Sequence, residues 1–174
     1  NEEIAKKLFY VINATGSGLA PFDSWLLIRG LKTLSIRLER EQENCRKLAN
    51  YLVSKGFKVR YTGLKDHPQY DLHNSQCRGP GAVLSFETGD LNFSSTIIEH
   101  CEIFSTTVSF GSVSSLISLP LRMSHASIDP SVLEDRNFPQ DLIRICTGIE
   151  DIEDLINDLD NTIRIATRKC NAKL

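Results

Sequence analysis

The chain has 174 residues, of which 41% are hydrophobic and 24% are charged, and its formal net charge is −2. These values are typical of a soluble globular protein of one domain, or of one domain with part of another. The slightly acidic balance, without a cluster of lysines and arginines, excludes a nucleic-acid-binding protein. No apolar run approaches the roughly 20 residues that cross a bilayer, which excludes a membrane-spanning protein.

Five cysteines occur at irregular spacings, with no C-x-x-C pair and no His/Cys spacing typical of zinc. We therefore predict free thiols in a reducing compartment, the cytoplasm, and no metal site. The last three residues, Ala172–Leu174, are a close variant of the Ser-Lys-Leu signal for peroxisomal import. Peroxisomal import is therefore an alternative location, and a frayed polar tail is the simpler explanation of this tripeptide.

The beginning of the chain predicts a helix that is already in progress. The first residue, Asn1, is not methionine, and residues 2–12 carry apolar side chains at helical spacing without the features of a targeting segment. We therefore expect the chain to be a piece of a longer protein.

Two further helices are predicted before residue 57. One begins at Pro21, a residue suited to a first helical turn, and is apolar nearly all round, so we expect it to be buried. Gly30 interrupts this pattern. Residues 31–55 then predict a long amphipathic helix that ends at Gly56, where glycine is the expected cap.

Beyond Gly56 the sequence alternates between strand and helix patterns. Four stretches have the alternation or the β-branched content of strands: residues 57–61, 82–87, 103–108 and 142–147. Two stretches have helical patterns: residues 93–100 and 149–168. The polar residues 64–80 are expected to form a loop. This half of the chain therefore predicts one compact α/β unit without internal repeats.

One charged residue, Arg144, lies in the middle of the apolar stretch that starts at Leu142. A cation on a largely buried strand costs several kcal/mol unless an anion meets it. The anion is either a protein carboxylate or a ligand carboxylate, which a guanidinium can bind with two parallel hydrogen bonds. An exposed edge strand is the third possibility, and the residues alone leave all three open.

Other polar residues carry weaker signals. Ser109 lacks the Gly-x-Ser-x-Gly context of a hydrolase nucleophile, and His125 is either a base or a structural histidine. The spacing of His67, His73 and His100 fits no standard metal site. Spacing alone therefore assigns no catalytic residue.

Two long segments resemble the pyridoxal-phosphate enzymes of transsulfuration, the Cys/Met metabolism family of fold type I. Ser17–Leu34 is similar to the segment that closes the family's cofactor domain and leads into its inter-domain helix. Leu142–Asp151 is similar to the family's "VRxSxGxED" strand, with Cys146 where serine is more frequent. The resemblance implies that Arg144 binds the substrate α-carboxylate.

The resemblance covers nearly the whole chain and implies its fold. We expect an α/β fold, the C-terminal domain of a fold-type-I enzyme, with a small, mostly antiparallel sheet that carries helices on one side. Residues 1–29 are then the end of the large cofactor domain, residues 30–56 the long connecting helix, and residues 57–174 the small C-terminal domain.

The loop that begins at Ser109 narrows the implied activity. Ser109–Val113 and Met123–Ile128 look like the fungal and plant β-lyases of the family. The related γ-lyases and γ-synthases usually have Leu-Gly-Gly at residues 110–112 and glutamate at Ser114. The resemblance therefore implies cleavage of cystathionine to homocysteine, pyruvate and ammonia in methionine biosynthesis. The alternatives are γ-elimination or γ-replacement, or a non-catalytic interaction module with this fold.

The resemblance also implies which parts of the site this chain holds. Arg144, Ser109 and Phe110 are the expected substrate-binding residues. The lysine that attaches the cofactor, the phosphate-binding loops and the aspartate on the pyridine nitrogen are expected upstream of Asn1. Pyridoxal 5'-phosphate would thus be bound mainly by the rest of the protein, in a homotetramer with active sites at subunit boundaries, and this chain alone would be inactive.

Overall fold

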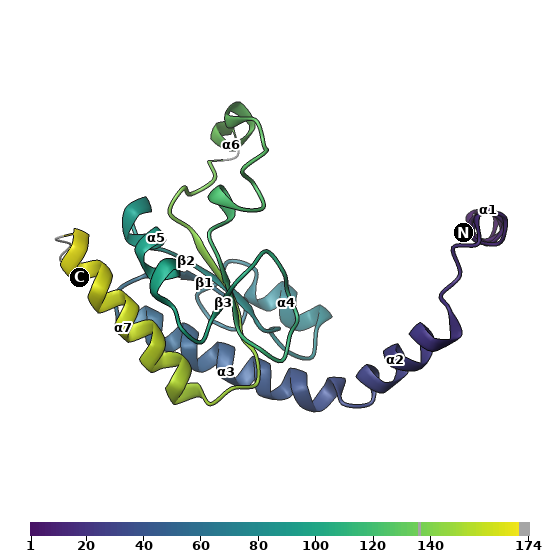
Figure 1. Ribbon diagram of the computed structural model, residues 1–174, viewed down its shortest axis with the longest axis horizontal. Helices are drawn as coiled ribbons and strands as arrows, with labels where there is room; N and C mark the ends of the chain where they lie inside the picture. The colour runs from purple at the N-terminus through teal and green to yellow at the C-terminus, as the bar shows by residue number, and fades with distance from the viewer. Residues whose placement is uncertain (136, 171–174) are drawn as a thin grey trace. The chain divides into compact units, whose positions relative to one another are not determined.

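The computed structural model describes residues 1–135 and 137–170 (Figure 1). The chain divides into two compact units, Asn1–Ile36 and Arg37–Leu174. The tripeptide Ala172–Leu174, on which the peroxisomal expectation rests, lies outside the described residues. Within the described part, no helix combines the length and the apolar character needed to cross a membrane.

The first unit contains α1 (Glu2–Thr15) and α2 (Pro21–Leu31). The left-handed backbone of Gly16, with φ of 67°, ends α1, and Pro21 begins α2 as expected. The expectation that α2 is buried is wrong for this chain, because Trp25 is 53% exposed and neither helix has a buried residue. Large apolar side chains of both helices are exposed, Phe9 and Phe22 among them.

The long helix α3 (Leu34–Ser54) crosses the boundary between the two units. It is followed by Gly56 with φ of 88°, in agreement with the predicted cap. At its C-terminal end, Tyr51 donates a hydrogen bond to Asp160 of α7 (Ile152–Cys170) at 2.8 Å, and Lys55 forms an ion pair with the same carboxylate at 2.7 Å. These polar contacts fix the end of α3 against α7.

The second unit is built on a five-stranded sheet with the order β1-β2-β5-β4-β3. The strands are β1 (Lys58–Arg60), β2 (Val83–Glu87), β3 (Ser105–Thr106), β4 (Leu116–Ser118) and β5 (Ile143–Cys146). All neighbours are antiparallel except β3 and β4, which are parallel. The predicted mostly antiparallel sheet is therefore confirmed, and β5 is its central strand rather than an edge.

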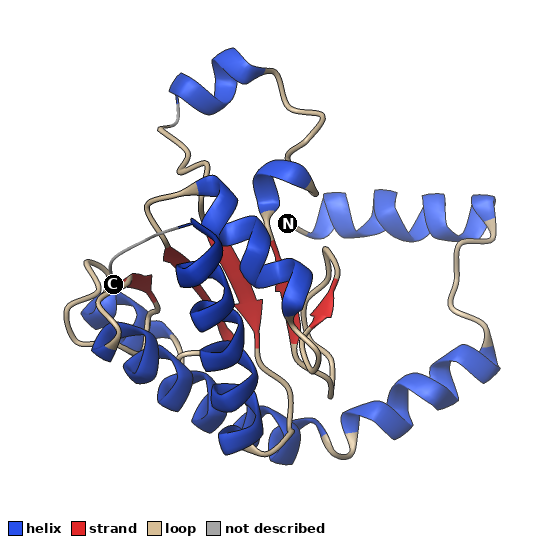
Figure 2. Ribbon diagram, turned by 60° about the vertical axis from the view of Figure 1, so that its left-hand side comes forward, coloured by secondary structure: helices blue, strands red, loops and turns tan. Residues whose placement is uncertain are grey.

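Helices α3, α5 (Leu91–His100) and α7 pack on one face of the sheet (Figures 1 and 2). The inward side chains of the three central strands are almost inaccessible: Leu84, Phe86, Ile117, Ile143 and Ile145. Because successive side chains of a strand alternate between faces, the residues between them lie on the opposite face. The one-sided arrangement of helices is thus confirmed, and the second face remains available for a site.

Several short elements differ from the sequence prediction or were not predicted. Residues 64–80 contain α4 (Tyr70–Gln76), which the sequence did not reveal because this helix buries no side chain. The segment that follows Ser109 contains β4, a strand of three residues, which is too short to give a periodic signal in the sequence. The predicted strand 103–108 is reduced to the two residues of β3. The chain also forms η1 (Pro120–Arg122) and α6 (Pro130–Asp135).

The segment before β4 is fastened to the end of β5. The amide N–H of Ser115 donates to Glu150 Oε1 at 2.5 Å, and the Ser115 hydroxyl donates to Oε2 at 2.9 Å. The Ser115 oxygen accepts from the N–H of Gly148 at 2.8 Å, and the N–H of Ile149 donates to Val113 O at 2.9 Å. These bonds hold the end of the 107–115 loop beside the central strand.

The close approach at Gly148 leaves no room for a side chain. A Cβ atom there would lie 2.3 Å from Val113 O and 2.7 Å from Ser114 C, both of which are backbone atoms. We expect Gly148→Ala to lower the free energy of unfolding of the second unit by about 1–3 kcal/mol, since the loop has to move. Urea unfolding measures this change, and hydrogen exchange at Gly111 reports the loosened loop.

The matched control is Gly30→Ala, because no atom lies within 4 Å of a Cβ added at this helical glycine. Unfolding of the second unit should be unchanged in the control. Equal stability of the Gly148→Ala variant and the wild type would contradict the close approach.

Candidate functional site

A row of polar side chains crosses the face of the sheet that the helices do not cover. Arg60, Ser85, Arg144 and Ser118 are direct cross-strand neighbours on β1, β2, β5 and β4. Residues opposite one another in a sheet point to the same face, so this row lies on the side away from the apolar core. On β2 and β5, the adjacent residues Leu84, Phe86, Ile143 and Ile145 point to the other, buried face of the sheet.

Among the side chains that the structure describes, none supplies a counter-ion to the guanidinium of Arg144. Its Nη2 atom is buried without a hydrogen-bond partner, and no carboxylate of residues 1–135 or 137–170 forms an ion pair with it. Burial lowers the pKa of Arg144, but an arginine remains charged at neutral pH. The hypothesis that a protein carboxylate neutralises Arg144 is therefore not supported by the described residues. The hypothesis of an exposed edge strand is wrong, because β5 is the central strand of the sheet.

An aromatic ring covers one side of this guanidinium. The Cζ atom of Arg144 lies 3.9 Å from the ring centroid of Phe110, a cation–π contact of about 0.5–2 kcal/mol. Phe110 is still 52% exposed, so its other face is open. The ring restricts the guanidinium plane without satisfying its N–H groups, which stay available to an acceptor.

The loop that carries Phe110 is pinned to the strand beneath it. The N–H of Gly111 donates to Cys146 Sγ at 3.2 Å, and Gly111 has φ of 70°, a conformation that favours glycine. The thiol of Cys146, which stands where serine is more frequent in the resembling family, is buried. Ser109 lies exposed in the same loop, and its predicted substrate contact stays a prediction.

Arg144 lines a cavity of about 310 Å³. The other lining residues come from the strands and from the segment between β4 and β5: Arg60, Val83, Leu84, Ser85, Pro120, His125, Phe138 and Leu142. The Arg60 guanidinium is ion-paired with Glu87, which also pairs with Lys58. The cavity thus offers a mostly apolar wall and one cation without a protein partner, which suits a ligand with a carboxylate and an aliphatic body.

Of the residues that line the cavity, only Arg144 was predicted as a site residue, and two of the others carry polar side chains that bear on its chemistry. His125 lies with its ring edge against Phe138, at a centroid distance of 4.8 Å, and its place in the cavity depends on long-range packing. Ser85 is a polar residue at an outward position of an apolar strand, and this break in alternation is a signal that the sequence does contain.

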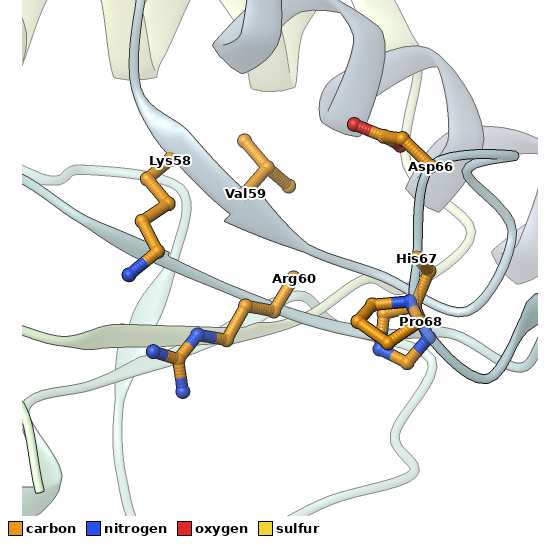
Figure 3. Close-up of a pocket in the computed structure, with 6 residues that line it drawn as sticks. All are labelled: Lys58, Val59, Arg60, Asp66, His67 and Pro68. Atoms are coloured by element: carbon orange, nitrogen blue, oxygen red, sulfur yellow. The ribbon is translucent and has the colours of Figure 1, made fainter. Parts of the chain in front are cut away.

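A second cavity of about 380 Å³ lies beside β1, lined by Lys58, Val59, Arg60, Asp66, His67 and Pro68 (Figure 3). Figure 3 shows the side chains of Lys58 and Arg60 extending away from Asp66. Both cations are paired with Glu87, with Lys58 Nζ at 3.1 Å from Oε2. An anion there would compete with this internal carboxylate, so the Arg144 cavity is the stronger candidate site.

No described lysine lines the Arg144 cavity. Lys6 and Lys7 are exposed and paired with glutamates one turn away, and Lys55 and Lys58 are paired with Asp160 and Glu87. The cation that the cavity offers is therefore the guanidinium of Arg144, which suits the binding of a carboxylate.

Comparison with known proteins gives consistent results. The profile of the family described as "Cys/Met metabolism PLP-dependent enzyme" matches residues 1–164. A cystathionine beta-lyase from Neurospora crassa is 58% identical over 161 residues, which are 92% of this chain and 35% of that protein. A chloroplastic mimosinase from Leucaena leucocephala is 48% identical over 169 residues, which are 96% of this chain and 38% of that protein.

A solved structure also matches most of the chain. The crystal structure of a cystathionine gamma synthase from Xanthomonas oryzae pv. oryzae in complex with cystathionine is 33% identical, with a TM-score of 0.89 over 97% of this chain and 44% of that one. The chain thus spans from about 35% to 44% of the length of these proteins. The shared fold and the match over residues 1–164 lead to one conclusion: this chain belongs to the family of Cys/Met metabolism PLP-dependent enzymes.

Proposed function

We propose that the whole protein is a pyridoxal-phosphate-dependent carbon–sulfur lyase that cleaves cystathionine to homocysteine, pyruvate and ammonia. This chain supplies the recognition of the substrate carboxylate. The observation that carries the proposal is the Arg144 guanidinium, which lines a cavity, has its Nη2 atom buried without a hydrogen-bond partner and has no acidic partner among the described residues. A carboxylate ligand neutralises this charge and satisfies its N–H groups at the same time.

Each residue of the site has a physical role in this proposal. Arg144 binds the α-carboxylate through two parallel hydrogen bonds, and Phe110 restricts the rotation of the guanidinium by lying 3.9 Å from it. Ser109 precedes Phe110 on the loop and lies over the same carboxylate. A ligand held at two points has a fixed orientation, which lowers the entropic cost of reaching the reactive geometry.

The remaining part of the protein supplies the cofactor site. Pyridoxal phosphate, when bound there, acts as an electron sink for the carbanion that forms at the substrate α-carbon. In this proposal the first unit is the end of the large cofactor domain, and the rest of that domain covers its exposed apolar side chains, such as Phe22, Trp25 and Leu27. Assembly as a homotetramer completes the active sites at the subunit boundaries.

The direction of elimination is the finer part of the proposal. Phe110, Ser112 and Ser114 stand where the γ-lyases and γ-synthases usually carry Leu, Gly and Glu, which favours β-elimination. The identity to the Neurospora crassa beta-lyase, 58%, exceeds the 33% to the Xanthomonas gamma synthase structure and supports the same choice. The mimosinase similarity adds mimosine as a second substrate to be tested.

The products of the purified full-length protein distinguish these activities. With cystathionine, β-elimination yields pyruvate and homocysteine, whereas γ-elimination yields 2-oxobutyrate and cysteine. We expect pyruvate as the oxo-acid product, measured by chromatography of its hydrazone, and slower turnover of mimosine. Formation of 2-oxobutyrate alone would assign the protein to γ-elimination.

Arg144 itself can be tested in the full-length protein. Arg144→Ala should lower kcat/KM for cystathionine by two or more orders of magnitude, because the carboxylate loses its charged partner and its orientation. Arg144→Lys should recover only part of the activity, since an ammonium group lacks the planar two-point geometry. The control is Arg168→Ala at an exposed position of α7, where activity should be unchanged. Full activity of Arg144→Ala would refute the proposed role.

The chain by itself should not react with the cofactor. When pyridoxal phosphate is added to residues 1–174, we expect no stoichiometric visible absorbance of a lysine adduct, because no described lysine lines the Arg144 cavity. Borohydride reduction followed by peptide mass spectrometry checks this. A single lysine modified in full yield would show that the chain holds its own attachment site.

A further inference from the structure

The Arg144 cavity contains a second buried polar atom that no described residue satisfies. Besides Nη2 of Arg144, the Nδ1 atom of His125 is buried without a hydrogen-bond partner. Both residues line the same cavity of about 310 Å³. A buried nitrogen without a hydrogen-bond partner is unfavourable, so two such atoms on residues that line one cavity indicate a group that is still to be bound there.

The position of His125 is fixed by its surroundings. Its backbone N–H donates to Pro120 O at 2.8 Å, and its carbonyl accepts from the N–H of Ile128 at 3.0 Å. The imidazole ring meets the Phe138 ring edge-on, with 73° between the planes. The backbone turn and the aromatic neighbour hold the ring in place, and neither of them uses Nδ1.

The charges around the cavity select the chemistry of the missing group. Arg144, which has no ion-pair partner among the described residues, repels a ligand cation, and Arg60 and Lys58 share the single carboxylate of Glu87, so the charges near the cavity favour an anion. The other walls include Val83, Leu142 and Pro120, which offer no side-chain hydrogen bond. A carboxylate has lone pairs for several donors, so it can accept from Arg144 and from a neutral imidazole Nδ1–H together.

We propose that His125 is a further substrate-binding residue, which donates a hydrogen bond from Nδ1 to the carboxylate that Arg144 binds. This inference rests on the proposed function and adds a second protein donor from a different segment of the chain. Arg144 supplies the charge from the central strand, and His125 sets the position of the carboxylate from the segment that follows η1.

A purely structural histidine is the competing explanation. In that case the ring serves only to pack against Phe138, and removal of the donor affects folding rather than ligand binding. The two explanations separate when the donor is removed but the shape is kept. Asparagine and leucine have the same branched shape, and only the asparagine amide can replace the Nδ1 donor.

The experiment compares His125→Asn with His125→Leu in the full-length holoenzyme. The probe is 3-(methylthio)propanoate, a thioether carboxylate without an amino group, and its primary amide is the uncharged control. Calorimetry gives the dissociation constants, steady-state kinetics gives KM and kcat for cystathionine, and thermal melting reports folding. Should His125→Leu not fold, His125→Met replaces it.

We expect His125→Leu to weaken binding of the carboxylate probe about 10- to 100-fold and to raise KM by a similar factor, with kcat less affected. His125→Asn should stay within about threefold of the wild type, and binding of the amide should be the same in all variants. Unchanged carboxylate binding in His125→Leu overturns the inference. Equal losses in both variants together with a lowered Tm also overturn it, because they indicate a packing role.

The Arg144→Ala variant separates this inference from the proposed function. If Arg144→Ala loses carboxylate binding and His125→Leu keeps it, only the role of His125 is wrong. If Arg144→Ala binds the carboxylate and turns over cystathionine as the wild type does, the proposed function itself is wrong.

Discussion

The central strand of the second unit holds a positive charge within a hydrogen-bonded sheet, and no described residue supplies its counter-ion. Arg144 lies on the central strand, so its backbone is paired on both sides, by β2 and by β4. The neighbouring residues Ile143 and Ile145 are fully buried on the helical side, and their packing fixes the direction in which the arginine points. The free energy gained by packing the apolar face thereby holds Arg144 in place, although no described residue on the other face neutralises its charge.

The loop over this charge is held by several weak contacts rather than by a single strong one. Phe110 contacts the guanidinium, Gly111 binds the Cys146 sulfur, and Ser115 connects Glu150 with Gly148. A further link joins the end of β5 to the long helix, because the Asn44 side chain donates to the carbonyls of Gly148 and Glu150 at 3.0 and 2.9 Å. The helix that leads into the second unit and the loop over the site are therefore attached to the same few residues.

Much of this arrangement could be predicted from the sequence, because periodic patterns extend over most of the elements. The alternation at residues 82–87 predicted β2, the helical spacing before Gly56 predicted α3, and the apolar stretch around Arg144 predicted the strand β5, although not its central position in the sheet. The burial of α2 was predicted wrongly. An apolar sequence indicates that a helix is suited to burial, but it does not tell which part of the protein buries it. That His125 and Arg144 line one cavity was not predictable, since it depends on how the segment after η1 packs beside the sheet, and no local pattern encodes this packing.

The contrast between the central strand and the loop above it has an evolutionary consequence. A substitution in β5 disturbs the pairing with both β2 and β4 and also the packing of the apolar core. Ser109 and Phe110, in contrast, are exposed and belong to no strand. Mutational drift is therefore tolerated far more readily at the loop than at the arginine. Related chains can therefore keep an arginine on the central strand and still vary in the loop above it.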